Sequence, residues 1–113
     1  MATVDDVRRI ARSLPRTEEA VVRDRVKFRI GRIVYLALSR DERTLGFAFP
    51  KDERDALVAA EPAKFHLPAP SDLRYHWVEC ALAEVDEEEL TELVVDAWRM
   101  CVPKRVAAAH LGR

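Results

Sequence analysis

Glycine is scarce in this chain of 113 residues, and its scarcity excludes several classes of enzyme. Only Gly31, Gly46 and Gly112 occur, so no glycine-rich loop is present to cradle the phosphates of a nucleotide. No serine or cysteine lies in the glycine-flanked turn that exposes the nucleophile of hydrolases. The acidic run Asp86–Glu89 marks an exposed helix start, the wrong setting for a general acid with a raised pKa. The sequence therefore predicts a protein that is not an enzyme.

Cysteine and long apolar runs are also lacking. The two cysteines, Cys80 and Cys101, fall within apolar patterns, which indicates buried reduced thiols rather than a disulfide framework. No apolar stretch reaches the length of a membrane span. Met1–Leu14 carries acids and arginines where a secretory signal needs an apolar centre. These features predict a cytoplasmic protein that does not enter the membrane.

A dominant charge sign and clustered metal ligands are missing as well. Nineteen Lys and Arg residues against 20 Asp and Glu residues give a net charge of −1, so any basic site must be local. The three histidines, His66, His76 and His110, are scattered and lack the spacing of metal ligands. We therefore expect no metal ion and no other cofactor. The ordinary balance of apolar and charged residues predicts one domain over residues 1–113, and we expect a monomer.

The stretch Val26–Phe49 is the part around which the rest of the chain is organised. Its first run, Val26–Ile30, alternates apolar residues with lysine and arginine, as a half-buried strand does. Gly31-Arg32 has the length of a tight hairpin turn. Ile33–Leu38 is apolar on both faces, which favours the centre of a sheet. Thr44–Phe49 alternates again, with small residues on one side. The pattern predicts a sheet with one core face and one shallow, basic, open face.

The rest of the chain predicts helices and a further strand around this meander. Before the meander we expect a helix from Thr3 to Leu14 with a capping box to Asp6, and a lead-in or first strand at Thr17–Arg23. After it we expect a short helix at Asp52–Ala60, a loop at Pro62–Asp72 with Phe65 and Leu67 against the core, and a last strand at Arg74–Ala83. The chain then continues as a long helix from Asp86, with Trp98 at the edge of its buried stripe, and a basic tail helix at Lys104–His110. We expect an α+β fold: an antiparallel sheet of four or five strands with helices packed on one face.

Short segments along the chain carry a family resemblance. They are Ser13-Leu14-Pro15 followed by Thr17-Glu18-Glu19, the hairpin with Phe28 and Gly31, His76-Trp77-Val78, Asp96-Ala97-Trp98-Arg99, and Val102-Pro103-Lys104-Arg105. This ordered set, which spans nearly the whole chain, resembles the MmcQ/YjbR-like family of small bacterial α+β proteins. The resemblance implies a frataxin-like α-β-α arrangement and DNA binding through a double wing of two β-hairpins, here the turns Gly31-Arg32 and Ser39–Arg43. Iron binding in frataxin is associated with an acidic first helix, whereas this one carries three arginines, so iron handling is not expected.

A basic row on the open sheet face is the first candidate site. The row contains Arg23, Arg25, Lys27 and Arg29, with Arg32, Arg40 and Arg43 at the turns. The residues predicted to bind nucleic acid are Lys27, Arg29, Arg32, Arg40 and Arg43. Such a row could contact the phosphates of DNA or RNA. The other interpretation is a solvated face whose charges prevent edge pairing between molecules, with neighbouring acids neutralising part of the charge.

Aromatic residues beside this row form the second candidate. Tyr35, His76 and Trp77 could line a pocket that binds a small ligand or a protein partner. Alternatively, Trp77 packs at the rim of the core and His76 bonds to the backbone. The ligand-binding interpretation requires Tyr35 and Trp77 to be exposed beside a concavity. The sequence thus predicts a binding module, with DNA or RNA as the first partner class and a protein or small ligand as the second.

Overall fold

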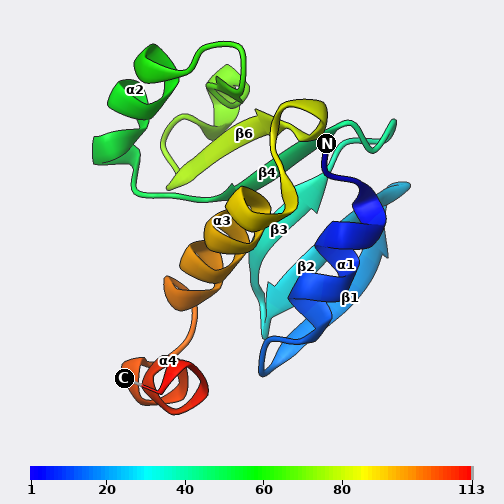
Figure 1. Ribbon diagram of the computed structural model, residues 1–113, viewed down its shortest axis with the longest axis vertical. Helices are drawn as coiled ribbons and strands as arrows, with labels where there is room; N and C mark the ends of the chain where they lie inside the picture. The colour runs from blue at the N-terminus through cyan, green and yellow to red at the C-terminus, as the bar shows by residue number, and fades with distance from the viewer. Residues whose placement is uncertain (113) are drawn as a thin grey trace.

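A six-stranded antiparallel sheet forms the centre of the structure, in the strand order β1-β2-β3-β4-β6-β5 (Figure 1). The structure is a computed structural model that describes residues 1–112. The strands are β1 (Thr17–Val22), β2 (Arg25–Ile30), β3 (Ile33–Leu38), β4 (Thr44–Ala48), β5 (Phe65–His66) and β6 (Trp77–Ala81). The helices are α1 (Val4–Arg12), α2 (Lys51–Ala60), α3 (Glu87–Arg99) and α4 (Lys104–Leu111), with single 3₁₀ turns η1 (Pro70–Asp72) and η2 (Leu82–Glu84). The predicted α+β class is confirmed.

One face of the sheet carries the core. The strand register aligns Phe28, Leu36, Phe47 and Val78 in a row across β2, β3, β4 and β6. All four side chains are almost completely buried, as the alternation in the sequence predicted. Such a row stabilises the fold because neighbouring strands bring its apolar side chains into contact and remove them from water.

Helices α1 and α3 cover this face of the sheet (Figure 1). Helix α1 begins at the predicted capping box, in which Thr3 and Asp6 each accept a backbone hydrogen bond from the other. Asp86 caps α3 by accepting a hydrogen bond from the Glu89 amide. Within residues 1–112, no helix combines the length and the apolar character that crossing a lipid bilayer requires.

The position expected for Trp98, at the edge of the buried stripe, is wrong. Its ring is fully buried, and the indole Nε1–H donates to the carbonyl oxygen of Pro15 at 2.9 Å. The loop that follows α1 brings this acceptor into the core, so the whole indole can be buried with its polar atom satisfied.

The segment between α2 and β6 also departs from expectation. Phe65 and His66 form the short strand β5 beside β6, which brings the sheet to six strands rather than four or five. Phe65 packs edge-on against Phe47, with ring centroids 6.4 Å apart. Leu67, however, is 47% exposed, because the chain leaves the sheet after His66 and continues towards the prolines of the loop. The expectation that Leu67 packs against the core is therefore wrong.

Replacing Phe47 with Ala is expected to lower the free energy of unfolding by about 3–5 kcal/mol, as measured by urea denaturation. The reason is that this ring is 1% exposed and lies between Phe49 and Phe65. Val21→Ala is the control, because Val21 is 67% exposed on an edge strand, and its effect should stay below about 0.5 kcal/mol. A loss under about 1 kcal/mol for Phe47→Ala would mean that the strand faces are wrongly assigned.

Candidate functional site

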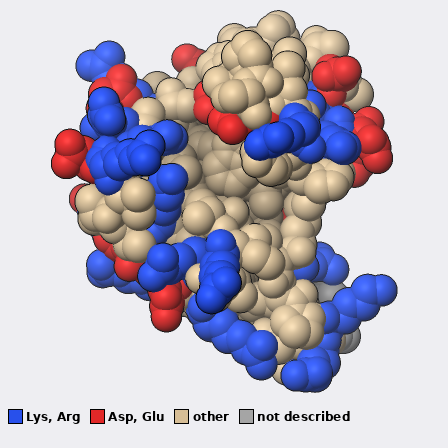
Figure 2. Space-filling model, turned by 180° about the vertical axis from the view of Figure 1, so that it is seen from behind, with Lys and Arg blue, Asp and Glu red and all other residues tan. Residues whose placement is uncertain are grey.

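The sheet face that α1 and α3 leave uncovered contains a concavity of about 750 Å³, here called the hollow (Figure 2). Its floor consists of Val34 and Ala37 from β3, Ala48 from β4 and the ring of Trp77 from β6. The volume lies within the range of roughly 300–1,000 Å³ that is usual for small-molecule sites. The hollow is larger than three other concavities of the described residues, which have volumes of about 510, 380 and 270 Å³.

Gly46 allows the Trp77 ring to lie on this floor. A Cβ atom at position 46 would be 2.6 Å from Trp77 Nε1, which is too close for any side chain. The small residues that the sequence places on the open face of β4 therefore make room for an aromatic side chain of the neighbouring strand. Trp77 is half-buried in this position and keeps part of its ring accessible from the hollow.

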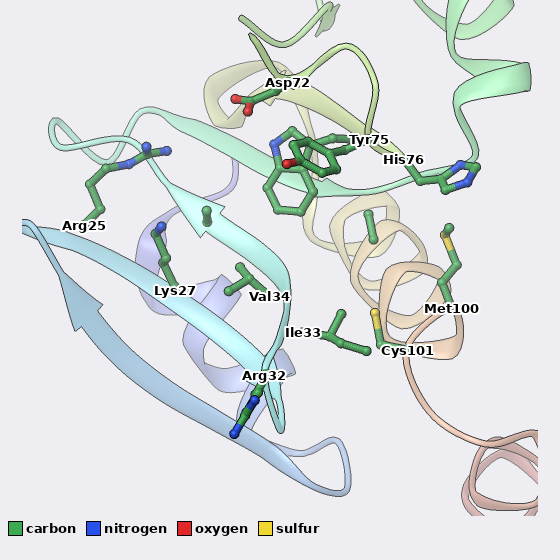
Figure 3. Close-up of a pocket in the computed structure, with 13 residues that line it drawn as sticks. Arg25, Lys27, Arg32, Ile33, Val34, Asp72, Tyr75, His76, Met100 and Cys101 are labelled. Carbon is green, nitrogen blue, oxygen red and sulfur yellow. The ribbon is translucent and has the colours of Figure 1, made fainter.

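Three cations form one wall of the hollow: Arg25 and Lys27 on β2, and Arg32 at the β2–β3 turn (Figure 3). The Arg25 Nε–H donates to the carbonyl oxygen of Leu38 at 3.0 Å, which fixes its side chain against β3. Within residues 1–112, none of the three cations has a carboxylate within 4.0 Å. Their positive charge is therefore available to an anion in the hollow.

The basic row that the sequence predicted is not one continuous surface. Lys27 and Arg32 line the hollow, but Arg29 pairs with Glu18, its neighbour on β1, at 3.3 Å. Arg40 and Arg43 lie at the β3–β4 turn, beyond the residues that line the hollow. The predicted site thus divides into two residues at the hollow, one ion-paired residue and two residues at a distant turn.

The two turns that would form wings lie at opposite ends of β3. Successive turns of an antiparallel meander alternate between the ends of the sheet, and the six residues of β3 span about 20 Å. The β3–β4 turn instead lies beside the β1–β2 turn, where Arg40 Nε–H donates to the carbonyl oxygen of Arg23 at 3.4 Å. The Gly31-Arg32 and Ser39–Arg43 turns therefore cannot act as an adjacent pair.

Tyr35 does not reach the hollow, so its assignment to the open face is wrong. The register between β2 and β3 shifts after Phe28, which leaves one extra residue on β3 and turns the Tyr35 ring towards the core. Tyr35 is fully buried, and its hydroxyl shares a hydrogen bond of 2.7 Å with that of Thr17. Burial raises the pKa of Tyr35 to about 12. The sequence pattern alone cannot reveal such a bulge, because it changes the alternation within an otherwise apolar run.

Tyr75 occupies the place that was expected for Tyr35. It lies on the segment before β6, lines the hollow and is 51% exposed (Figure 3). His76 also lines the hollow, and its Nδ1 accepts a hydrogen bond of 3.0 Å from the backbone amide of Lys51. This bond caps the start of α2, which has no side-chain cap of its own. The interpretation of His76 as a backbone partner is therefore correct.

Arg54 holds this aromatic segment in place and was missed in the sequence. Its side chain on α2 is 7% exposed and donates to three carbonyl oxygens, those of Leu73 (2.9 Å), Tyr75 (3.0 Å) and Trp77 (3.0 Å). Its Nε atom is buried and has no partner in the described part of the chain. The sequence contains one signal that Arg54 is buried. It precedes the half-buried Leu57 and Val58 by three and four residues, which places it on the same, inward face of α2.

Burial raises the pKa of both cysteine thiols. Cys80 and Cys101 are both free, and Cys80 is buried on β6, where burial raises its pKa to about 12. A thiol with this pKa remains protonated at neutral pH and is a poor nucleophile or metal ligand. Cys101 is half-buried at the edge of the hollow, and burial raises its pKa too. Across residues 1–112, His, Cys, Asp and Glu side chains form no group of three or more that could hold a metal ion.

Comparison with known proteins identifies the family, because residues 12–100 match the family model YjbR. The chain belongs to the YjbR family. Uncharacterised proteins of Mycobacterium bovis and Mycobacterium tuberculosis are 34% identical to it over 137 aligned positions, which cover 99% of this chain and 98% of theirs. A crystal structure of a Deinococcus radiodurans protein with a DUF419 domain has a TM-score of 0.78 and 23% identity, and covers 99% of this chain and 89% of that one. That structure supports the fold of this YjbR-family member.

Replacing Arg54 with Met is expected to lower the free energy of unfolding by about 2 kcal/mol or more, because three carbonyl groups lose a charged donor. Amide hydrogen exchange should also quicken in the segment from Leu73 to Trp77. Urea denaturation and exchange mass spectrometry measure the two effects. Arg105→Met makes the same chemical change at an exposed position of α4 and serves as the control. A stability change below about 0.5 kcal/mol for Arg54→Met would refute its role in holding the segment.

Proposed function

We propose that this YjbR-family protein binds single-stranded nucleic acid in the hollow. One observation carries the proposal: unpaired cations face accessible aromatic rings across an apolar floor. Domains that bind single strands combine a cationic groove for the phosphates with aromatic side chains on which bases stack. Arg25, Lys27 and Arg32 supply the first element, and Tyr75 and Trp77 supply the second.

The distribution of charge supports this proposal despite the net charge of −1. Figure 2 shows Lys and Arg side chains grouped around the tan centre of the hollow. On the covered side of the sheet, acids are instead paired with arginines, as in Arg8–Glu19 at 3.0 Å and Arg9–Glu87 at 2.8 Å. A polyanion responds to the local charge within about a Debye length, roughly 8–10 Å, and not to the total charge of the protein.

The geometry favours a single strand over a duplex. The two hairpin turns lie at opposite ends of β3, so they cannot enter a duplex groove as a pair. The aromatic rings line a concavity, where they can stack on a base that has been turned out of its strand but not on bases paired within a helix. Met100 and Cys101, at the end of α3, form a further part of the wall of the hollow.

A small-ligand site is the second candidate, and the volume of the hollow favours it. An anionic compound with an apolar or aromatic part would make the same contacts as one nucleotide of a strand. The two candidates differ in one measurable property, which is whether affinity increases with the length of the bound chain.

Binding of an oligothymidylate of about ten nucleotides should weaken as salt increases, because phosphate contacts release counterions. With about three contacts, the plot of log affinity against log salt concentration should have a slope of about −2. Lys27→Ala and Arg32→Ala should each make this slope shallower by about 0.7. Arg12→Ala, on the covered side of the sheet, is the matched control and should leave it unchanged. Fluorescence anisotropy at several salt concentrations measures these slopes.

Three outcomes would refute the proposal in different ways. Affinity weaker than about 0.1 mM at physiological salt would exclude nucleic acid as the partner. Equal or tighter binding of a duplex with the same length would exclude the preference for a single strand. Competition by thymidine monophosphate at the same concentration as the oligonucleotide would identify the hollow as a small-ligand site.

A further inference from the structure

We infer that the hollow selects guanine for the base that it receives, and that the carboxylate of Asp72 recognises this base. The inference rests on the proposed binding of single strands, and it adds a base preference to that function. It starts from a feature that phosphate binding does not explain, which is an acidic side chain in the wall of a cationic site.

Asp72 is the only Asp or Glu among the described residues that line the hollow. It is half-buried, and within residues 1–112 its carboxylate has no ion pair or hydrogen bond within the usual distances. Its backbone, in contrast, is held at both ends: its amide donates to Ala69 at 2.8 Å, and its carbonyl accepts from the Tyr75 amide at 3.0 Å. The carboxylate is thus an acceptor without a donor, carried on a backbone that is held in place.

The charge of Asp72 also acts on a neighbouring side chain. A second half-buried carboxylate, Glu79 on β6, lies close enough for the two charges to interact. Burial raises the pKa of Glu79 above its usual value; Arg25 and His66 partly oppose this rise, and the charge of Asp72 adds to it. Partly buried carboxylates without donors cost free energy, and a ligand that brings donors would recover it.

The position of Asp72 beside an aromatic ring indicates the kind of donor. Figure 3 shows Asp72 and Tyr75 on the same side of the hollow, with Arg25 and Lys27 across from them. A base stacked on Tyr75 would direct its edge towards the carboxylate while its phosphate lies near the cations. Single-stranded bases are read along this edge because it is free of a pairing partner.

Guanine is the base whose edge matches a carboxylate. Its N1–H and N2 amino group are adjacent donors, so they can bond to both carboxylate oxygens at once, and these bonds are charge-assisted. Adenine and cytosine present a ring-nitrogen acceptor beside their amino group, which repels the carboxylate. Thymine and uracil present one N–H between two carbonyl oxygens. Asp72 therefore favours guanine over each of the other bases.

The experiment compares oligothymidylates of about ten nucleotides that carry one central guanine, adenine, cytosine or hypoxanthine. By fluorescence anisotropy, the guanine strand should bind about tenfold more tightly than the others, the order of magnitude of one bidentate base contact. Hypoxanthine lacks the N2 amino group and should lose most of this gain. Asp72→Asn should reduce the preference to within about twofold, because an amide offers only one acceptor in place of two charged ones.

Asp55→Asn is the matched control, since it removes the same charge from an exposed position of α2 outside the hollow and should keep the preference. Thermal unfolding of Asp72→Asn verifies that the variant folds. Equal binding of all four strands, or a guanine preference that survives Asp72→Asn, overturns the inference and leaves the proposed function intact. Failure of every strand to bind at physiological salt overturns both.

Discussion

Burial of one face of the sheet is the interaction on which the rest of this structure depends. Helices α1 and α3 occupy a single side, and the row of Phe28, Leu36, Phe47 and Val78 gives them a continuous apolar surface. Because both covering helices lie on that side, the opposite face must be closed by other means or remain open to solvent. In this chain the opposite face is partly closed and partly open to solvent, and the open part is the hollow.

The open face is closed in part by a single aromatic ring and a single arginine. Trp77 lies against Gly46, where no other residue would leave room for it. Arg54 reaches from α2 to three carbonyl groups and shapes the segment that carries Tyr75. A buried guanidinium is costly to desolvate, and its bonds to three acceptors offset this cost. The shape of the hollow therefore depends in part on Gly46 and Arg54, which are absent from the residues that line it.

The charges of this protein are balanced in number but not in position. Arginines of α1 neutralise acids of β1 and α3 on the covered side. Within residues 1–112, by contrast, Arg25 and Lys27 of β2 and Arg32 at the β2–β3 turn have no carboxylate within 4.0 Å. Among the described residues, Asp72 is the one acid in the wall of the hollow, and it has no ion pair there. The hollow thus contains cations and a carboxylate that do not pair with each other. Such an arrangement is expected where a ligand brings acceptors for the cations and donors for the carboxylate.

The sequence alone determined most of the fold. Alternation in Val26–Ile30 and Thr44–Phe49, helical spacing in the flanking segments and the capping box at Thr3 identified the main elements and the core face. These signals are local, since each depends on the chemistry of residues within a few positions of one another. For the same reason they also placed Lys27, Arg32 and Trp77 at the open face, where they line the hollow.

Only the tertiary structure decided which of the candidate residues share a site. A bulge opposite Phe28 turned Tyr35 into the core, the meander separated Arg32 from Arg40 and Arg43, and register with β1 gave Arg29 a partner in Glu18. Arg54 and Asp72 became prominent only through contacts, or the lack of contacts, with residues distant in sequence. Such relations depend on strand register and on loops folding back over the sheet. They arise from the packing of the whole chain, so no local pattern encodes them.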